Sequence, residues 1–137
     1  MIRLVVSNQR GGVAKTTTTH SLARYCADRG LRVLIIDTDP QGSIGAVLGL
    51  KPPTYLHQFI VQQLRLKDCV VRAHPQIDVL CSNRDSLETE ALLMGRTGRE
   101  MTFVLLFQRI DEEYDVVLVD VAPSISLLHV IAEGGRS

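Results

Sequence analysis

A glycine-rich segment lies between an apolar run and a helical pattern, and this order constrains the fold more than any other feature of the chain. The segment reads SNQRGGVAKTTTT at residues 7–19 and follows the apolar run at residues 2–6. Gly11 and Gly12 let the backbone adopt conformations closed to residues with a Cβ atom, so successive amides can turn toward an anion. A strand, a glycine loop and a helix in this order are typical of a phosphate-binding loop.

The end of this segment carries side chains suited to a bound nucleotide. Lys15 provides a mobile positive charge, and Thr16 provides a hydroxyl that can ligate magnesium. The helix that begins there directs the positive end of its dipole toward the phosphates. Four consecutive β-branched residues at 16–19 are a poor choice for opening a helix on propensity alone. The alternative interpretation is a tight glycine turn before an ordinary helix, but the position between strand and helix favours the phosphate loop.

The composition indicates one domain with an aliphatic α/β core. The 137 residues are 45% hydrophobic and 22% charged, and aromatic residues are scarce at 4%. Fifteen basic residues balance fifteen acidic ones, so the whole chain lacks an electrostatic footprint for nucleic acid or an anionic membrane. Cys26, Cys69 and Cys81 have no metal-ligand spacing, and we expect them to be buried thiols. Without a leader pattern or a long apolar run, the sequence predicts a cytoplasmic protein.

The apolar runs predict buried parallel strands, because they are continuous rather than alternating. Residues 16–29 between the first two runs predict a helix, with Gly30 as its C-terminal cap. The alternation of strands and helices predicts an α/β fold with a doubly wound, mainly parallel sheet and a site at the carboxyl ends of its strands. The predicted strands span residues 2–6, 33–36, 77–80 and 116–119, and further helical patterns span residues 55–64, 86–94 and 100–112.

Two of the predicted strands run into carboxylates. The second ends in DTDPQG from Asp37, and the fourth ends in DVAPS from Asp120. Beside a loop bearing Lys and Thr, such strand ends can hold Mg²⁺ on a nucleotide, with Thr16 as a direct ligand and Asp120 acting through water. Asp39 is placed to orient an attacking water. Each acidic segment alone also fits plain turn chemistry, so the combination of three segments indicates the magnesium nucleotide site.

These segments resemble the ParA group of the ParA/MinD partitioning ATPases, which are P-loop NTPases with a deviant Walker A motif. That motif is written KGGxxK followed by Ser or Thr, and residues 10–16 read RGGVAKT. DTDPQG resembles the family's switch I, and VLVDVAPS resembles its Walker B strand with switch II. The resemblance extends to about Leu128. DPQG favours ParA over MinD, and nothing resembles the amphipathic membrane helix with which MinD proteins end.

The resemblance implies a role for each site residue. Lys15 would contact the β and γ phosphates, Asp39 would be the catalytic carboxylate, and Asp120 would be the Walker B residue. Asp37 would support the metal site. The resemblance thus implies a catalytic set of Asp39, Arg10 and Lys15, a nucleotide-binding set of Gly11, Gly12, Val13, Ala14, Lys15, Thr16 and Thr17, and a metal set of Thr16, Asp37 and Asp120.

The resemblance also implies cofactors and partners. In that family Mg·ATP promotes a sandwich dimer that binds DNA without sequence preference, and a ParB-like protein stimulates the hydrolysis that releases it. ATP and Mg²⁺ would be the cofactors, a homodimer would form, and no membrane would be bound. No guanine-reading NKxD or TKxD string occurs, which favours ATP over GTP. Arg84, Arg96 and Arg99 are more typical of a solvated helix surface than of a DNA-binding patch.

Two departures from the family pattern leave an alternative function open. Arg10 replaces the signature lysine that reaches across the dimer, and its planar, forked guanidinium is a poor substitute at a tight site. Family members continue for about as much sequence again, so we expect the chain to be the N-terminal part of one ParA-like domain, with its first strand at an exposed edge. The alternative is a truncated, non-hydrolysing nucleotide-binding or regulatory remnant. A reductase resembling the nitrogenase iron protein fits poorly, because Cys26, Cys69 and Cys81 do not lie at the positions after the Walker motifs where its cluster ligands would be.

Overall fold

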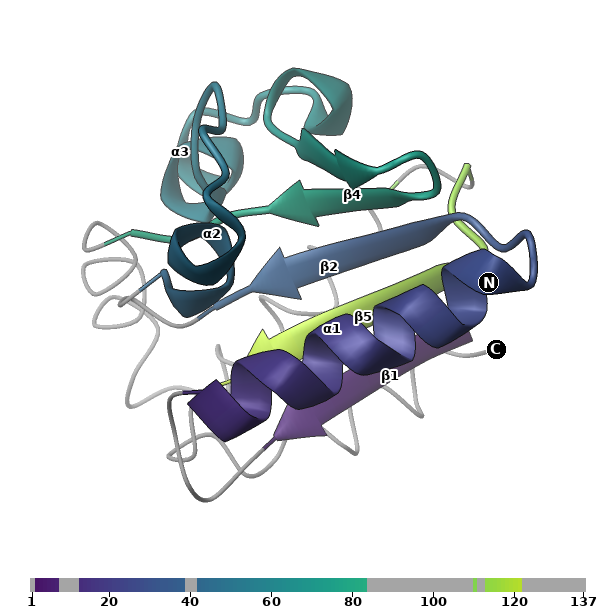
Figure 1. Cartoon of the computed structure of the whole chain (residues 1–137). Coiled ribbons are helices and arrows are strands. Elements are labelled where there is room, and N and C mark those ends of the chain that lie inside the picture. Colours follow the sequence, from purple (N-terminus) through teal and green to yellow (C-terminus); the bar gives the residue numbers. More distant parts are fainter. Residues whose placement is uncertain (1, 8–12, 39–41, 84–109, 111–112, 122–137) are drawn as a thin grey trace.

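The computed structural model describes residues 2–7, 13–38, 42–83, 110 and 113–121. These residues form a five-stranded sheet in the order β1-β5-β2-β4-β3 (Figure 1). All strands except β3 run parallel, which confirms the predicted doubly wound, mainly parallel sheet. The strands at the predicted positions are β1 (Ile2–Ser7), β2 (Val33–Asp37), β4 (Ile77–Leu80) and β5 (Val116–Val121). Within the described residues β1 lies at the end of the sheet, as expected, and it pairs with β5.

The first predicted helix is present as α1 (Val13–Asp28) and begins three residues earlier than expected. Gly30 caps its end with φ of +81°, and the Gly30 N–H donates to the Ala27 carbonyl at 2.9 Å. The predicted helix at residues 55–64 is shorter, because α3 spans only Leu56–Val61. Gln63 has a φ of +51°, a left-handed conformation that cannot continue the helix.

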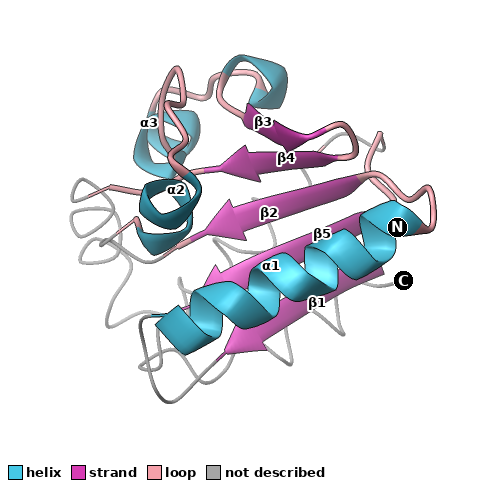
Figure 2. Cartoon of the chain, in the orientation of Figure 1, coloured by secondary structure: helices cyan, strands magenta, loops and turns pink. Residues whose placement is uncertain are grey.

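The structure also contains elements that the sequence patterns did not predict. They are α2 (Ser43–Leu48), the 3₁₀ turn η1 (Leu66–Asp68) and β3 (Val71–His74), which pairs antiparallel with β4. Figure 2 shows β3 at the far edge of the sheet from β1. The predicted helices at residues 86–94 and 100–112 lie outside the described residues, except for Ile110, which is buried.

Hydrophobic clusters cover both faces of the sheet. Alternate residues of each central strand face opposite sides, as the strand period of two requires. On one face α1 covers the sheet, and on the other face α3 does so. Cys26, Cys69 and Cys81 are buried and form no disulfide, as predicted. The α1 face includes Ala23, Ala27, Val33, Ile35, Val116 and Leu118, and the α3 face includes Leu34, Ile36, Phe59, Val117 and Val119.

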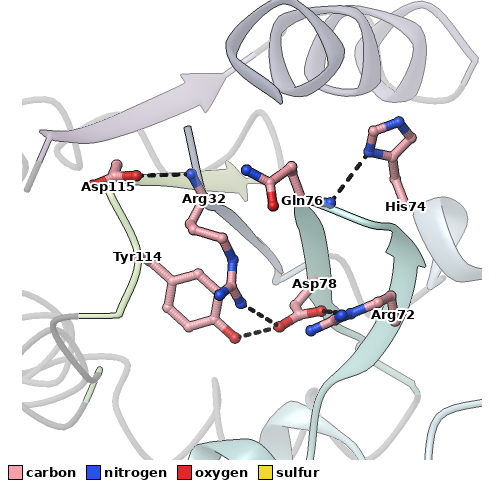
Figure 3. A network of polar contacts seen from close by, with 7 residues as sticks. All are labelled: Arg32, Arg72, His74, Gln76, Asp78, Tyr114 and Asp115. Atoms are coloured by element: carbon pink, nitrogen blue, oxygen red, sulfur yellow. Dashed lines mark hydrogen bonds and ion pairs between the residues drawn. The ribbon is translucent and has the colours of Figure 1, made fainter. Parts of the chain in front are cut away.

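A polar network joins the amino ends of the strands, opposite the edge where the parallel strands end (Figure 3). Its centre is Asp78 in β4, which is only 6% exposed. Asp78 accepts a hydrogen bond from the Tyr114 hydroxyl at 2.6 Å and another from Arg72 Nε at 3.1 Å, and Arg32 Nη2 lies 3.7 Å away. Burial and the hydrogen bond to Asp78 raise the pKa of Tyr114. The network therefore ties the starts of β2 and β5 to the β3–β4 hairpin.

Candidate functional site

Two buried aspartates lie side by side at the carboxyl edge of the sheet. Asp37 ends β2 and is the Cα partner of Asp120 in β5, and both residues are fully buried. Neighbouring strands lie about 4.8 Å apart, so the two carboxylates share one small region. Asp120 is flanked on its other side by Val6 of β1. The two predicted acidic strand ends are therefore brought together.

Strand alternation places both aspartate side chains on the face covered by α1. Val33 and Ile35 of β2 belong to the α1-side cluster, and Asp37 is the next residue of that row. In β5 the row is Val116 and Leu118, followed by Asp120. Figure 1 shows the first turn of α1 at this same edge, beside the arrowheads of β5 and β1. The start of the helix and the two carboxylates therefore lie on one side of one edge.

Short hydrogen bonds fix the backbone where the strands end. The backbone N–H and the hydroxyl of Thr38 both donate to the Asp120 carbonyl, at 3.0 and 2.8 Å. The Ser82 hydroxyl donates to the Asp37 carbonyl at 2.6 Å. These bonds join the ends of β2, β4 and β5, and they fix the backbone positions of Asp37 and Asp120 relative to each other.

Helix α2 approaches the end of β4 closely. Gly42 precedes α2 with a φ of +64°, and a Cβ atom there would lie 2.6 Å from the Ser82 carbonyl oxygen. At Gly45 a Cβ atom would lie 3.3 Å from Cys81 Sγ. The Leu56 N–H, at the start of α3, donates to the Cys81 carbonyl at 2.7 Å. The described residues on both sides of 39–41 are thus held against the same strand ends.

Cys81 lies in this region as a neutral thiol. Burial raises its pKa from 9.0 to about 12, and the negative charge of Asp37 adds to the shift. A rise of this size leaves about 1000-fold less thiolate than an ordinary cysteine has at neutral pH.

We therefore expect Cys81 to resist alkylation in the folded protein. Its rate with iodoacetamide should keep rising with pH toward about 12 instead of levelling off near 9.0, since only the thiolate reacts. Peptide mapping by mass spectrometry after timed alkylation measures this rate, and the same reaction in urea is the control. Native alkylation at pH 8 as fast as in urea would contradict this neutral, buried thiol.

The other predicted site residues divide into two groups. Val13, Ala14, Lys15, Thr16 and Thr17 form the first residues of α1. Arg10, Gly11, Gly12 and Asp39 lie outside the described residues.

The donor set suits magnesium better than a softer metal. Magnesium takes one or two carboxylates and keeps several waters, and Asp37 with Asp120 offers that number of carboxylates. Among the residues that the structure describes, His, Cys, Asp and Glu form no cluster of three or more able to hold a metal. No helix in those same ranges has the length and apolar character needed to cross a membrane.

Sequence reasoning missed three residues that shape the site. Thr38 lies inside the DTDPQG motif, between two aspartates, and this position beside the acidic residues was the signal that could have marked it as part of the site. Gly42 ends that motif, where a glycine after a polar turn suggests a left-handed conformation. Ser82 follows β4 without any motif, so nothing in the pattern marked it.

Comparisons with known proteins identify relatives of the chain. A family model described as "AAA domain" matches residues 1–133. The chromosome partitioning protein ParA of Caulobacter vibrioides is 35% identical over 136 residues, covering 94% of this chain and 51% of that protein. ParA of Myxococcus xanthus is 32% identical over 129 residues, covering 91% of this chain and 46% of that protein. The chain thus spans about half the length of these relatives.

One solved structure combines similar sequence and similar fold. It is cobyrinic acid a,c-diamide synthase from Mycobacterium smegmatis with a bound ATP analogue and magnesium. Its sequence is 36% identical, with a TM-score of 0.79, and the match covers 98% of this chain and 55% of that one. The fold described above is therefore found in a protein solved with nucleotide and metal.

Proposed function

Because this chain belongs to the AAA domain family and, within it, to the ParA-type P-loop ATPases, we propose that it binds Mg·ATP at the carboxyl edge of its sheet and hydrolyses it in a partitioning switch. The products would be ADP and phosphate. ATP and Mg²⁺ are proposed as cofactors because a 36% identical protein was solved with an ATP analogue and magnesium.

The observation that carries this proposal is the buried pair Asp37 and Asp120 beside the start of α1. Two carboxylates shielded from water repel each other, and a divalent cation nearby relieves that repulsion. Thr16 would ligate the ion directly, Asp120 would act through water, and Asp37 would support the site. The bound ion would supply charge neutralisation on the β and γ phosphates.

The nucleotide would lie at the N-terminal end of α1. The amides of residues 11–14 and the dipole of a 16-residue helix would receive the phosphates. Lys15 would contact the β and γ phosphates, and Thr17 would complete the nucleotide-binding set. Asp39 would orient the attacking water, while Lys15 and Arg10 would offset the charge that develops in the transition state.

The proposed switch includes the partners that the family resemblance implies. ATP binding would favour a homodimer, the dimer would bind DNA without sequence preference, and a ParB-like protein would stimulate hydrolysis. We propose that this activity takes place in the cytoplasm. All three cysteines are free thiols, and free thiols are typical of proteins in a reducing compartment.

Titration calorimetry with ATP and Mg²⁺ tests the proposal. Wild type is expected to bind, and Lys15→Ala is expected to bind at least ~100-fold more weakly, because the lysine charge meets the phosphates. Lys67→Ala is the matched control, since Lys67 is exposed in η1, which precedes the edge strand β3. Wild type that does not bind, or binds independently of Lys15, overturns the proposal. Lys15-dependent binding without hydrolysis under any partner condition would favour the non-hydrolysing alternative.

Restoring the family lysine is expected to increase turnover. Arg10→Lys should raise DNA-stimulated ATP hydrolysis by roughly tenfold while leaving ATP affinity within about twofold, because the family motif uses a compact ammonium at this position and a planar, forked guanidinium is not equivalent to it. The rate of phosphate release at saturating ATP measures the turnover number. An unchanged turnover number would show that Arg10 serves the reaction as well as lysine does.

A further inference from the structure

One threonine of α1 lies on the buried side of the helix. The sheet-facing residues of α1 are Thr19, Ala23, Cys26 and Ala27, spaced three and four apart as one helical face requires. Thr19 is the polar member of this stripe, and it is fully buried. The three others pack in the apolar cluster of that face.

The packing on this face repeats in layers, and the layers place Thr19 beside the aspartates. Four residues of a helix rise about 6 Å, and two residues of a strand rise about 6.6 Å. α1 begins at the edge where the strands end, so it runs against them (Figure 1). Each step from Ala27 to Ala23 to Thr19 therefore matches one step from Val116 to Leu118 to Asp120.

The same step along β2 runs from Val33 through Ile35 to Asp37. The Thr19 layer therefore contains both carboxylates of the proposed metal site.

The Thr19 hydroxyl has no hydrogen-bond partner within the described part of the chain, although its oxygen is buried. A helical threonine can donate to the carbonyl four residues earlier, but this hydroxyl does not. A buried hydroxyl without a partner costs free energy, and such groups in native proteins call for a reason. The layer spacing thus puts this hydroxyl donor at the level of the two carboxylates.

We propose that Thr19 is a positioning residue of the magnesium site, whose hydroxyl donates a hydrogen bond to the Asp120 carboxylate when Mg·ATP is bound. This inference rests on the proposed function. Asp120 is favoured over Asp37 because α1 crosses β5, the strand that carries Asp120 (Figure 1). Carboxylates that serve a metal are commonly held by such outer hydrogen bonds, which orient them toward the ion or its waters. Thr19 touches neither the nucleotide nor the metal in this role.

The test measures how much magnesium strengthens ATP binding. The dissociation constant for ATP is determined with excess Mg²⁺ and again with EDTA, and their ratio is the magnesium effect. Thr19→Val keeps the shape and removes the hydroxyl, and we expect it to reduce this ratio about tenfold. The affinity for ATP in EDTA should be unchanged. The melting temperature of the nucleotide-free protein should be unchanged or higher, because the variant removes a buried hydroxyl that has no hydrogen-bond partner among the residues that the structure describes. Thr19→Ser should restore most of the ratio.

Thr18→Val is the matched control, because it makes the same change at the exposed neighbouring position of the same helix. Its magnesium effect should equal that of wild type. If wild type binds Mg·ATP through Lys15 but Thr19→Val keeps the full magnesium effect, the proposal for Thr19 fails and the proposed function stands. If Thr19→Val lowers the melting temperature and weakens binding equally with and without Mg²⁺, the hydroxyl is structural and the proposal is overturned. If wild type shows no Lys15-dependent binding, both proposals fail.

Discussion

Asp120→Asn is expected to remove most of the magnesium dependence of ATP binding without destabilising the nucleotide-free protein. The asparagine keeps the size of the side chain and deletes one negative charge from a fully buried pair. Without its neighbour's charge Asp37 is relieved of repulsion, so the free energy of unfolding should stay equal or rise. The proposed magnesium site would lose one of the two carboxylates that serve it, so the affinity for Mg·ATP should fall about 100-fold.

Two measurements on the same protein separate these effects. Urea unfolding gives the stability, and titration of ATP with Mg²⁺ or EDTA gives the magnesium effect. Asp68→Asn is the control, since Asp68 is half-exposed and its ion pair with Arg65 lies at the surface. A variant at Asp120 that keeps wild-type magnesium dependence would show that the buried pair does not serve a metal.

Gly42→Ala is expected to destabilise the protein by about 3 kcal/mol, through backbone strain and a steric clash together. Gly42 has a φ of +64°, which is strained for any residue with a Cβ atom. That Cβ would lie 2.6 Å from the Ser82 carbonyl oxygen, a backbone atom held at the end of β4. Urea unfolding of the purified variant measures the loss.

Gly49 supplies the control for this substitution. It ends α2 with a φ of +65°, nearly the same as Gly42, but a Cβ atom there would meet nothing within 4 Å. Gly49→Ala should therefore cost only the backbone strain, about 1 kcal/mol. The difference between the two variants isolates the close approach of α2 to Ser82. If both variants lose the same free energy of unfolding, the Ser82 carbonyl can move without cost, and its contact with Gly42 does not stabilise the site.

The sequence was most informative where short-range patterns carry the structure. Apolar runs located the four parallel strands, because burial on both faces leaves few polar positions within them. Asp78 in β4 is one such position. The position of Asp37 and Asp120 at one edge followed from a general property of parallel sheets, whose carboxyl ends meet at one edge. That the two residues are direct neighbours is known only from the structure. Gly30 was correctly expected to cap α1.

The missed elements lacked such patterns for physical reasons. β3 is half-exposed and carries Arg72 and His74, so its composition resembles a loop. α2 has only six residues, fewer than two turns, which is too short for a helical period to stand out. The network around Asp78 joins residues as far apart in the sequence as Arg32 and Tyr114, and the sequence alone gives no signal of which distant charges meet.

The burial of Thr19 was hidden for a similar reason. Thr16 to Thr19 read as one uniform run, and only the rotation of α1 against the sheet distinguishes a buried threonine from the exposed Thr18.

The strand order also has a consequence for synthesis on the ribosome. β1 and β2 both pair with β5 and not with each other. The hydrogen bonds between Val33 and Val116 can therefore form only after β5 has been synthesised. When β1, α1 and β2 leave the ribosome, the position of β5 between the two apolar strands is still unoccupied. β5 follows only after about 80 more residues have been made. We expect nascent chains that stop before β5 to be bound by chaperones, and chains that include it to be released.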